Sequence, residues 1–192
     1  IEESIGDAVK ALMKQDVELA KKVMSGDAEI DRTERKIEDL CLRLLLQQQP
    51  VARDLRNISA ALKMVTDMER IGDHATDISE LAIVLSEKKY VKKLDHIEEM
   101  ARETMVMLIQ SLEAYVEKDL DKAQKVIAHD DVIDDLFEEV KQELIELIRN
   151  HADEGEQAVD LLMVTKYFER IGDHATNIAE WVIFSITGQI AG

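Results

Sequence analysis

One eight-residue sequence, Glu-Arg-Ile-Gly-Asp-His-Ala-Thr, occurs twice in this chain, at residues 69–76 and again at residues 169–176. The similarity continues upstream, because residues 14–31 align with residues 117–134 once a length difference of three residues is allowed. Two copies about 100 residues apart fill the chain, and self-similarity on this scale is typical of a duplicated structural unit. The chain is therefore expected to fold as two similar modules.

Composition indicates that both modules are helical. One Pro and seven Gly leave few turn signals, and aromatic residues make up only 4% of the 192 residues. The abundant Leu, Ala, Glu, Lys and Met residues are strong helix formers, whereas strands favour β-branched and aromatic residues. We predict an all-α fold of two tandem three-helix bundles, at residues 1–88 and 94–192. The basic stretch 88–93 is expected to be a helix end and linker.

The helix boundaries within each module are marked by few signals. The first helix is predicted to end near Gly26 in the first module and near His129 in the second. The second helix then runs to about Gln49, where Pro50 breaks it, and to Asn150 in the second module. The third helix of each module carries the octapeptide.

The charge and the cysteine content limit the partners. The chain has 24 Lys and Arg against 41 Asp and Glu, a formal charge of −17. Nucleic acid is a poor partner for such a surface, because phosphate backbones require clustered cations. The single cysteine fits a reducing compartment, so we expect a cytoplasmic protein, and no stretch is apolar enough to span a bilayer. A start at Ile-Glu-Glu without Met suggests that a few N-terminal residues are missing.

An acidic row continues an apolar seam along the third helix. One apolar stripe of this helix contains Leu55, Ile58, Leu62 and Val65. The next positions on that stripe are Glu69, Asp73, Asp77 and Glu80. A spacing of four residues stacks the first three carboxylates one turn apart, where like charges repel. A solvated acidic face is the simplest explanation for one such row.

Repetition of the row favours a binding site instead. The second copy has Glu169, Asp173 and Asn177 at the same positions, within a block better preserved than the surrounding core. The second helices add further carboxylates at matching places, and two facing helices then contribute four carboxylates to one site. Oxygen ligands without cysteine suit hard divalent or trivalent cations, which would relieve the repulsion. The carboxylates of the second helices are Asp27, Asp31, Asp130 and Asp134.

Other residues of the octapeptide have structural explanations. His74 and His174 point about 100° or more away from the acidic row, so we expect them to bond a neighbouring acid or solvent. Arg70 and Arg170 are placed to form salt bridges with that row. Glycine in mid-helix costs ~1 kcal/mol relative to Ala. The glycines Gly72 and Gly172 therefore indicate either the close approach of another helix or room for a ligand.

Catalytic motifs are absent from the sequence. It has no Glu-x-x-His, no phosphate-binding glycine loop and no His-Glu-x-x-His, and Cys41 lies in an apolar run typical of a buried thiol. An enzyme is not indicated, and a metal-dependent hydrolase or oxidase is disfavoured. The alternative is a metal-free helical adaptor that docks on a transporter or kinase through an apolar patch. That patch would contain Trp181, Val182, Ile183, Phe184 and Ile186.

Several motifs together resemble the PhoU family. They are Glu-Arg-Ile-Gly-Asp-x-Ala-x-[Asn/Asp]-Ile in each third helix, Asp-x-x-Ile-Asp at 27–31 and 130–134, and the segment 50–58, which is similar to Pro-x-Ala-x-Asp-Leu-Arg-x-Ile. The resemblance implies a cytoplasmic regulator that restrains a phosphate-specific ABC transporter and links it to a sensor histidine kinase. It also implies multinuclear iron or zinc clusters on the acidic motifs and a homodimer that reaches the membrane only through its partners.

The resemblance also implies a set of metal ligands. Asn177 in place of Asp77 gives the second site one negative charge less, so it is expected to hold fewer or weaker metals. Bound metal would neutralise local charge and create a surface able to bind inorganic phosphate or an acidic partner. The implied ligands are Asp27, Asp31, Glu69, Asp73 and Asp77 in the first module, and Asp130, Asp134, Glu169, Asp173 and Asn177 in the second.

Overall fold

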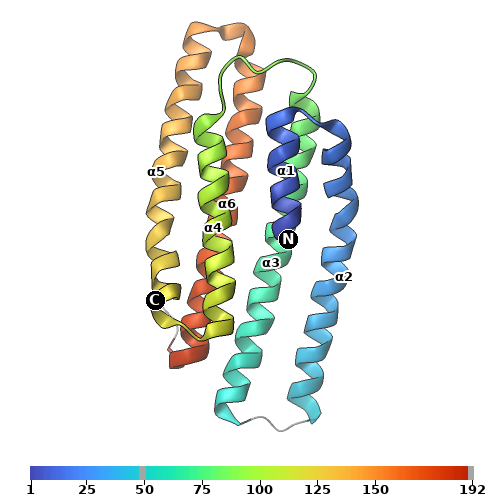
Figure 1. Ribbon diagram of the computed structural model, residues 1–192, viewed down its shortest axis with the longest axis vertical. Coiled ribbons are helices and arrows are strands. Elements are labelled where there is room, and N and C mark those ends of the chain that lie inside the picture. The colour runs from blue at the N-terminus through green and yellow to red at the C-terminus, as the bar shows by residue number, and fades with distance from the viewer. Residues whose placement is uncertain (48–50, 190–192) are drawn as a thin grey trace.

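A computed structural model describes residues 1–47 and 51–189, and all regular structure in these two ranges is helical (Figure 1). This confirms the all-α prediction. Pro50, the predicted helix breaker, lies outside the described residues. The elements are α1 (Glu2–Lys14), α2 (Val17–Gln47), α3 (Ala52–Leu85), α4 (Asp95–Glu117), α5 (Leu120–Asn150), the 3₁₀ turn η1 (Ala152–Glu154) and α6 (Gly155–Thr187).

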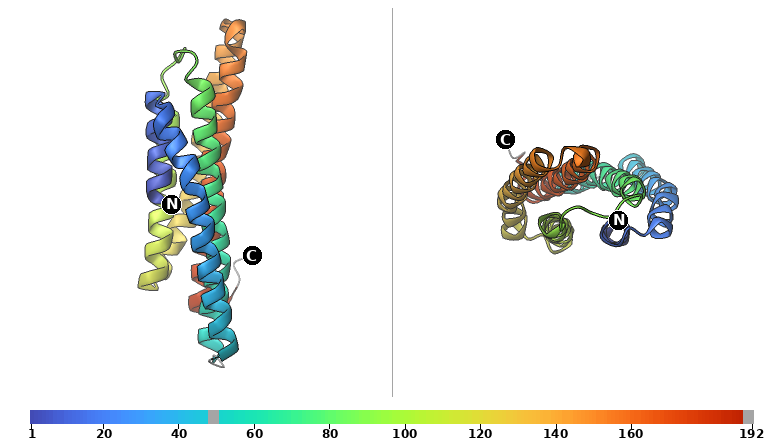
Figure 2. Two further views of the ribbon diagram at one scale, coloured as in Figure 1. Left: turned by 90° about the vertical axis from the view of Figure 1, so that its right-hand side faces the viewer. Right: turned by 90° about the horizontal axis from the view of Figure 1, so that it is seen from above.

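The two three-helix modules lie side by side and run in opposite directions. In Figure 1 the α2–α3 hairpin projects at one end of the molecule and the α5–α6 hairpin at the other. Helices α2, α3, α6 and α5 form one curved layer, and α1 and α4 cover the same side of it (Figure 2). The modules meet mainly where α3 packs against α6. The predicted pair of bundles related by the repeat is thus confirmed.

The first helix of each module is much shorter than we predicted. Gly26 and His129 lie inside α2 and α5, because the chain turns earlier, at Gln15 (φ 53°) and Lys118 (φ 56°). An aspartate follows each turn and caps the next helix: Asp16 Oδ1 accepts from the amide of Leu19 at 3.0 Å, and Asp119 Oδ1 from that of Lys122 at 3.0 Å. Helices that end in a left-handed residue usually have glycine there, and neither of these turns does. The sequence therefore gave no signal for them.

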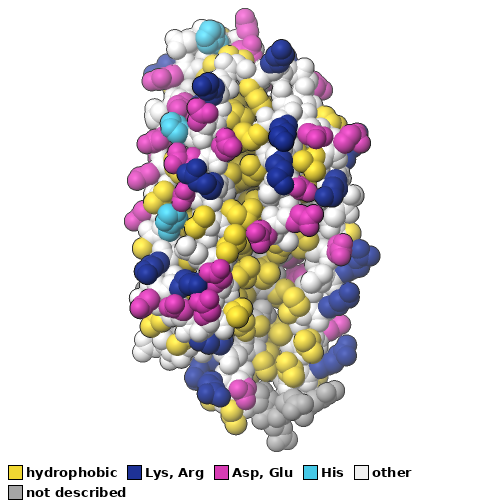
Figure 3. Space-filling model, in the orientation of Figure 1, with side chains coloured by type: hydrophobic (Ala, Val, Ile, Leu, Met, Phe, Trp, Pro, Cys, Tyr) yellow, Lys and Arg dark blue, Asp and Glu magenta, His cyan; other side chains and the backbone are white. Residues whose placement is uncertain are grey.

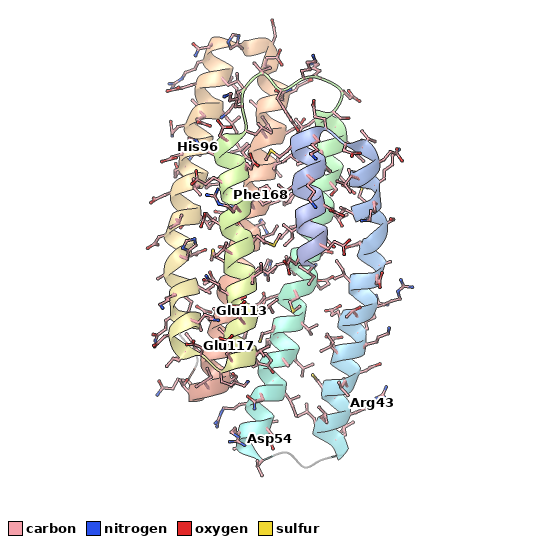
Figure 4. All side chains as sticks on the ribbon, viewed as in Figure 1. Arg43, Asp54, His96, Glu113, Glu117 and Phe168 are labelled. Atoms are coloured by element: carbon pink, nitrogen blue, oxygen red, sulfur yellow. The ribbon has the colours of Figure 1, made fainter. Side chains whose placement is uncertain are left out.

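The core stripe of α3 matches the helical periodicity. Ile71, Ala75 and Ile78 have no exposed surface, and the same positions of α6 are equally buried. Phe168 of α6 is the largest fully buried side chain, and Figure 4 places it among the helices of the second module. These side chains belong to one apolar core cluster that contains residues of both modules.

The mid-helix glycines mark close helix approach. A Cβ at Gly72 would lie 3.0 Å from Ile30 Cδ1 and 3.1 Å from Ile30 Cγ2 of α2. A Cβ at Gly172 would lie 3.5 Å from the equivalent Ile133 of α5, an ordinary contact. Of the two explanations for these glycines, close packing of a neighbouring helix therefore accounts for Gly72.

These distances predict that alanine substitutions at the two glycines affect thermal stability differently. Gly172→Ala gains helix propensity without a clash, so we expect it to stabilise the protein by ~0.5–1 kcal/mol and to raise the Tm by roughly 2–3 °C. Gly72→Ala has the same gain, but Ile30 must move to admit the new methyl group. Thermal unfolding followed by circular dichroism should therefore give Gly72→Ala the lower Tm. Equal values would contradict the difference in packing.

The apolar face of the α2–α3 hairpin is partly uncovered, because α1 has 13 residues and α4 has 23. Leu44 is 37% exposed, whereas Leu147 at the equivalent position in α5 is 9% exposed. A cavity of about 550 Å³ lies beside the start of α1. Hydrophobic side chains gather over this part of the surface in Figure 3. The exposed apolar residues around this end of the hairpin, which point to more than one side of α2, are Leu40, Leu42, Leu44, Leu46, Val51 and Leu55.

The C-terminal apolar segment, by contrast, belongs to the core. Val182 is fully buried, and Trp181, Ile183 and Ile186 pack against the core cluster. Trp181 also contacts Phe184 edge to face, with ring centroids 5.7 Å apart. The docking patch proposed for a metal-free adaptor is therefore largely occupied within the protein itself.

Candidate metal centre and its surroundings

The facing surfaces of α2 and α3 carry five carboxylates that interact electrostatically, which we call the first acidic groove and define by Asp27, Asp31, Glu69, Asp73 and Asp77. Burial is the largest cause that raises the pKa of Asp27, and the charges of Asp31 and Asp73 raise it further. Burial also raises the pKa of Glu69, and Asp73 adds to the effect. All five predicted residues of the first module thus lie within one electrostatic field.

Each carboxylate of the first acidic groove has a local partner. Arg70 donates from Nη1 to Asp73 Oδ2 at 2.9 Å, and its Nε lies 3.5 Å from Glu69 Oε2. Thr76 donates its hydroxyl to Asp27 Oδ1 at 3.3 Å. The predicted salt bridge of Arg70 is confirmed. These bonds orient Asp27, Glu69 and Asp73 in the groove.

The groove contains one acid that the sequence reasoning missed. Glu34 of α2 raises the pKa of Glu69, and its own pKa is raised by burial, by Glu38 and by Asp31. It follows Asp27 and Asp31 at spacings of seven and three residues, which place it on the same helical face. The repeat gave no hint of it, because Phe137 stands at the equivalent position of α5.

The second acidic groove, between α5 and α6, contains Asp130, Asp134, Glu169 and Asp173. Burial is the main cause that raises the pKa of Asp130, followed by the charges of Asp173 and Asp134. Burial and Glu169 raise the pKa of Asp173. Lys166 forms an ion pair with Glu169, so this groove has a cation where the first groove has an additional acid.

Asn177 does not join the second acidic groove in this structure. Its Nδ2 donates instead to Asp67 Oδ1 of α3 at 3.2 Å, across the boundary between the modules. Nine of the ten predicted residues therefore lie in the two grooves, and the tenth turns toward the other module. The weaker metal binding expected of the second site stays a prediction.

The two octapeptide histidines meet between the modules. Their ring centroids are 5.7 Å apart. Nδ1 of His74 lies 3.2 Å from Asp77 Oδ2, and Nδ1 of His174 lies 2.8 Å from Asp67 Oδ1. The predicted bond to a neighbouring acid is thus confirmed for both residues. Burial lowers the pKa of His74, and the bond to Asp77 opposes that shift only in part.

The donor set of the grooves suits a hard metal ion. Within residues 1–47 and 51–189, no three His, Cys, Asp or Glu side chains already converge in a metal-binding geometry. The five acids of the first groove nevertheless offer oxygen ligands, and burial, followed by the neighbouring carboxylates, raises the pKa of Asp27 and Glu69, so a cation would relieve both costs. Binding would require Asp73 to leave Arg70. On the chemistry of the ligands the residues fit a metal, and they fit better in the first groove than in the second.

The raised pKa of Asp27 predicts that the substitution Asp27→Asn stabilises the protein in a pH-dependent way. Its folded pKa lies above the ordinary 3.8, so the charged carboxylate costs stability above the folded pKa, and the cost vanishes once both states are protonated. In metal-free protein kept in chelator, Asp27→Asn should raise the Tm by roughly 1–3 °C near neutral pH. The gain should disappear as the pH falls toward the ordinary value. A gain independent of pH would contradict the assignment.

The described residues thus define a class of protein: a duplicated helical bundle with an acidic groove in each half. No helix in this part of the chain combines the length and apolar character needed to cross a bilayer. The PhoU domain family matches residues 1–82 and 97–182. The chain belongs to the PhoU family.

Relatives are similar over almost the whole chain. The phosphate-specific transport system accessory protein PhoU homolog of Clostridium acetobutylicum is 41% identical and covers 98% of this chain and 86% of its own length. The Escherichia coli PhoU is 30% identical, over 98% of this chain and 78% of its own length. The crystal structure of PhoU from Pseudomonas aeruginosa superposes with a TM-score of 0.94 at 33% identity, over 98% of this chain and 90% of that one. The Clostridium acetobutylicum and Escherichia coli relatives are named as accessory proteins of a phosphate-specific transport system.

Proposed function

We propose that this protein restrains a phosphate-specific ABC transporter and that its acidic grooves carry the metal ions needed for that activity. The observation that supports the proposal is the placement of interacting carboxylates from two facing helices in each module, where burial raises the pKa of Asp27, Glu69 and Asp130. Relatives named as accessory proteins of phosphate-specific transport supply the system in which it acts.

The metal would be iron or zinc, bound by oxygen. The first acidic groove, with Glu34 in addition, would hold the larger share, and the second groove would hold less because Lys166 competes for Glu169. Bound cations supply local positive charge to a protein of net charge −17. A partner with an acidic surface, or inorganic phosphate, could then be bound. A sensor histidine kinase as second partner, a homodimer and a cytoplasmic location are parts of the same proposal.

Phosphate uptake in cells tests the regulatory role. Cells that lack this protein should take up radiolabelled phosphate faster in phosphate-rich medium, and the wild-type gene should restore the slow rate. A gene encoding Glu69→Ala and Asp73→Ala should fail to restore it, although the variant accumulates normally. Unchanged uptake in cells lacking the protein would contradict the role as a restraint on the transporter.

A metal-free adaptor remains the second candidate, and the exposed apolar face of the α2–α3 hairpin favours it. That face is open over the end of α2 and the start of α3. In this case the groove variant would restore normal uptake, whereas a charged substitution on the hairpin, such as Leu46→Glu, would not. The two variants therefore separate the two functions.

A further inference from the structure

The pseudo-twofold axis of the molecule passes between His74 and His174. These residues are equivalent in the repeat, they lie on the antiparallel helices α3 and α6, and their rings are 5.7 Å apart. A residue pair that touches its own repeat equivalent lies on the axis. Whatever occupies the space beside these rings is therefore shared by both modules.

Each histidine retains one carboxylate partner, although the partner comes from a different position. Asp77 bonds His74 within α3, but the equivalent residue in α6 is Asn177, and Asp67 reaches His174 from the other module instead. The residue equivalent to Asp67 is Tyr167, which stacks on His74 with centroids 5.5 Å apart. The carboxylate has changed position in the repeat, and the bond to Nδ1 is present in both halves.

This arrangement determines what the rings present to a ligand. A carboxylate only accepts, so Nδ1 carries the hydrogen in each bond, and Nε2 of the neutral imidazole is then an acceptor. Neither Nε2 has a hydrogen-bond partner among the residues that the structure describes. Each ring therefore offers an acceptor whose orientation is set by the carboxylate behind it.

A cavity of about 500 Å³ lies beside the two rings and combines acceptors with cationic donors. Arg70 and Arg170 line it together with the hydroxyl-bearing Thr76 and the carboxylate of Asp77. Arg70 is engaged by Asp73, whereas Arg170 makes no salt bridge within the described ranges and is exposed. A planar guanidinium is well suited to the oxygens of a tetrahedral anion.

The presence of both donors and acceptors in the cavity distinguishes phosphate from sulfate. Near neutral pH inorganic phosphate carries at least one P–OH hydrogen, which needs an acceptor, whereas sulfate carries none. A cavity with arginines alone would accept both anions, but carboxylates and imidazole acceptors beside the arginines repel an anion that has no hydrogen to donate. The lining therefore offers donors to phosphate oxygens and acceptors to a P–OH group, and its three carboxylates, Asp27, Asp73 and Asp77, outnumber its two arginines.

We propose that this cavity on the pseudo-twofold axis binds inorganic phosphate in its protonated forms, with Arg170 on the phosphate oxygens and the acceptors of the cavity on the P–OH group. The choice of phosphate rests on the proposed function, which places the protein in phosphate transport. The cavity also contains Asp27 and Asp73, the acids of the first acidic groove. Metal in that groove would offset their charge, so phosphate binds more tightly to the metal-loaded protein.

Isothermal titration of inorganic phosphate into metal-free and zinc-loaded protein, dialysed free of unbound zinc, tests the site. Phosphate should bind, and sulfate at equal ionic strength should bind at least tenfold more weakly. Arg170→Gln should weaken phosphate binding at least tenfold while its zinc content stays at the wild-type level. Arg43→Gln, which removes the same charge at the far end of the α2–α3 hairpin (Figure 4), should leave the affinity within twofold.

Three outcomes would overturn the proposal: no binding at millimolar phosphate to either form, equal affinities for sulfate and phosphate, or equal losses in the two arginine variants. Phosphate bound only by zinc-loaded protein and insensitive to Arg170→Gln would sit on the metal and not in the cavity, which also contradicts the proposal. A second variant, His74→Gln with His174→Gln, should narrow the preference for phosphate over sulfate. Each result leaves the uptake experiment unaffected, so failure of this site and failure of the proposed function are distinguishable.

Discussion

Replacing Glu69 and Asp73 together by Ala is expected to remove more than half of the iron or zinc that co-purifies with the protein. These side chains are the two α3 acids at the centre of the first acidic groove, 17% and 34% exposed. Their removal leaves Asp77 as the one α3 acid of the groove that still faces Asp27 and Asp31 on α2. Elemental analysis of protein purified without chelator or affinity-tag metal, expressed as moles of metal per chain, measures the loss.

A matched control separates ligand loss from charge loss. Asp135→Ala with Glu139→Ala removes the same two residue types at the same spacing, from exposed positions of α5. This control should retain wild-type metal, and the helical content of both double variants should stay near wild type. The equivalent substitution in the second module, Glu169→Ala with Asp173→Ala, should remove less metal per chain than the Glu69 and Asp73 variant. Unchanged metal content in the Glu69 and Asp73 variant would remove the assignment of the groove as a metal centre.

Phe168→Ala is expected to cause the largest loss of stability of any single substitution considered. The side chain has no exposed surface and is the largest in the core. Truncation removes its apolar contacts and leaves a cavity between α6 and its neighbours, at a cost of ~3–5 kcal/mol. For a chain of this length the Tm should fall by roughly 10 °C, as measured by thermal unfolding.

The repeat supplies a control for this substitution. Met68 is the equivalent residue of α3, and it is only partly buried against the core. Met68→Ala should therefore cost about half as much or less, because a half-exposed side chain loses less apolar contact. Equal losses at the two positions would show that burial in the two modules is more alike than the structure indicates.

Sequence reasoning predicted most of the fold, because the relevant signals are periodic. The core stripe of α3 follows the helical repeat, and the acidic rows follow it on another face. The duplication then required a second copy of both. The residues of the first acidic groove were found because they recur at a spacing of four within α3 and again within α2.

The features that were missed depend on single residues or on contacts between modules. The turns at Gln15 and Lys118 lack glycine, and their aspartate caps resemble ordinary surface residues of a charged helix. The second copy has Tyr167 and not an acid at the position of Asp67. No repeat pattern therefore indicates the bonds of Asp67 to His174 and Asn177. The burial of Val182 depends on the packing of α6 within the bundle, which an apolar run of residues does not specify.

His74 bonds an aspartate of its own module, whereas His174 bonds an aspartate of the other module. The two halves of this duplicated chain are therefore not equivalent. A homodimer of either half would have two Asp77 carboxylates opposite two Asp67 carboxylates, or two Asn177 amides opposite two Tyr167 rings, and neither arrangement reproduces the bonds seen here. The first half supplies Asp67 to His174, whereas His74 takes its carboxylate from its own helix. The second half alone would therefore lack the bond that orients its histidine.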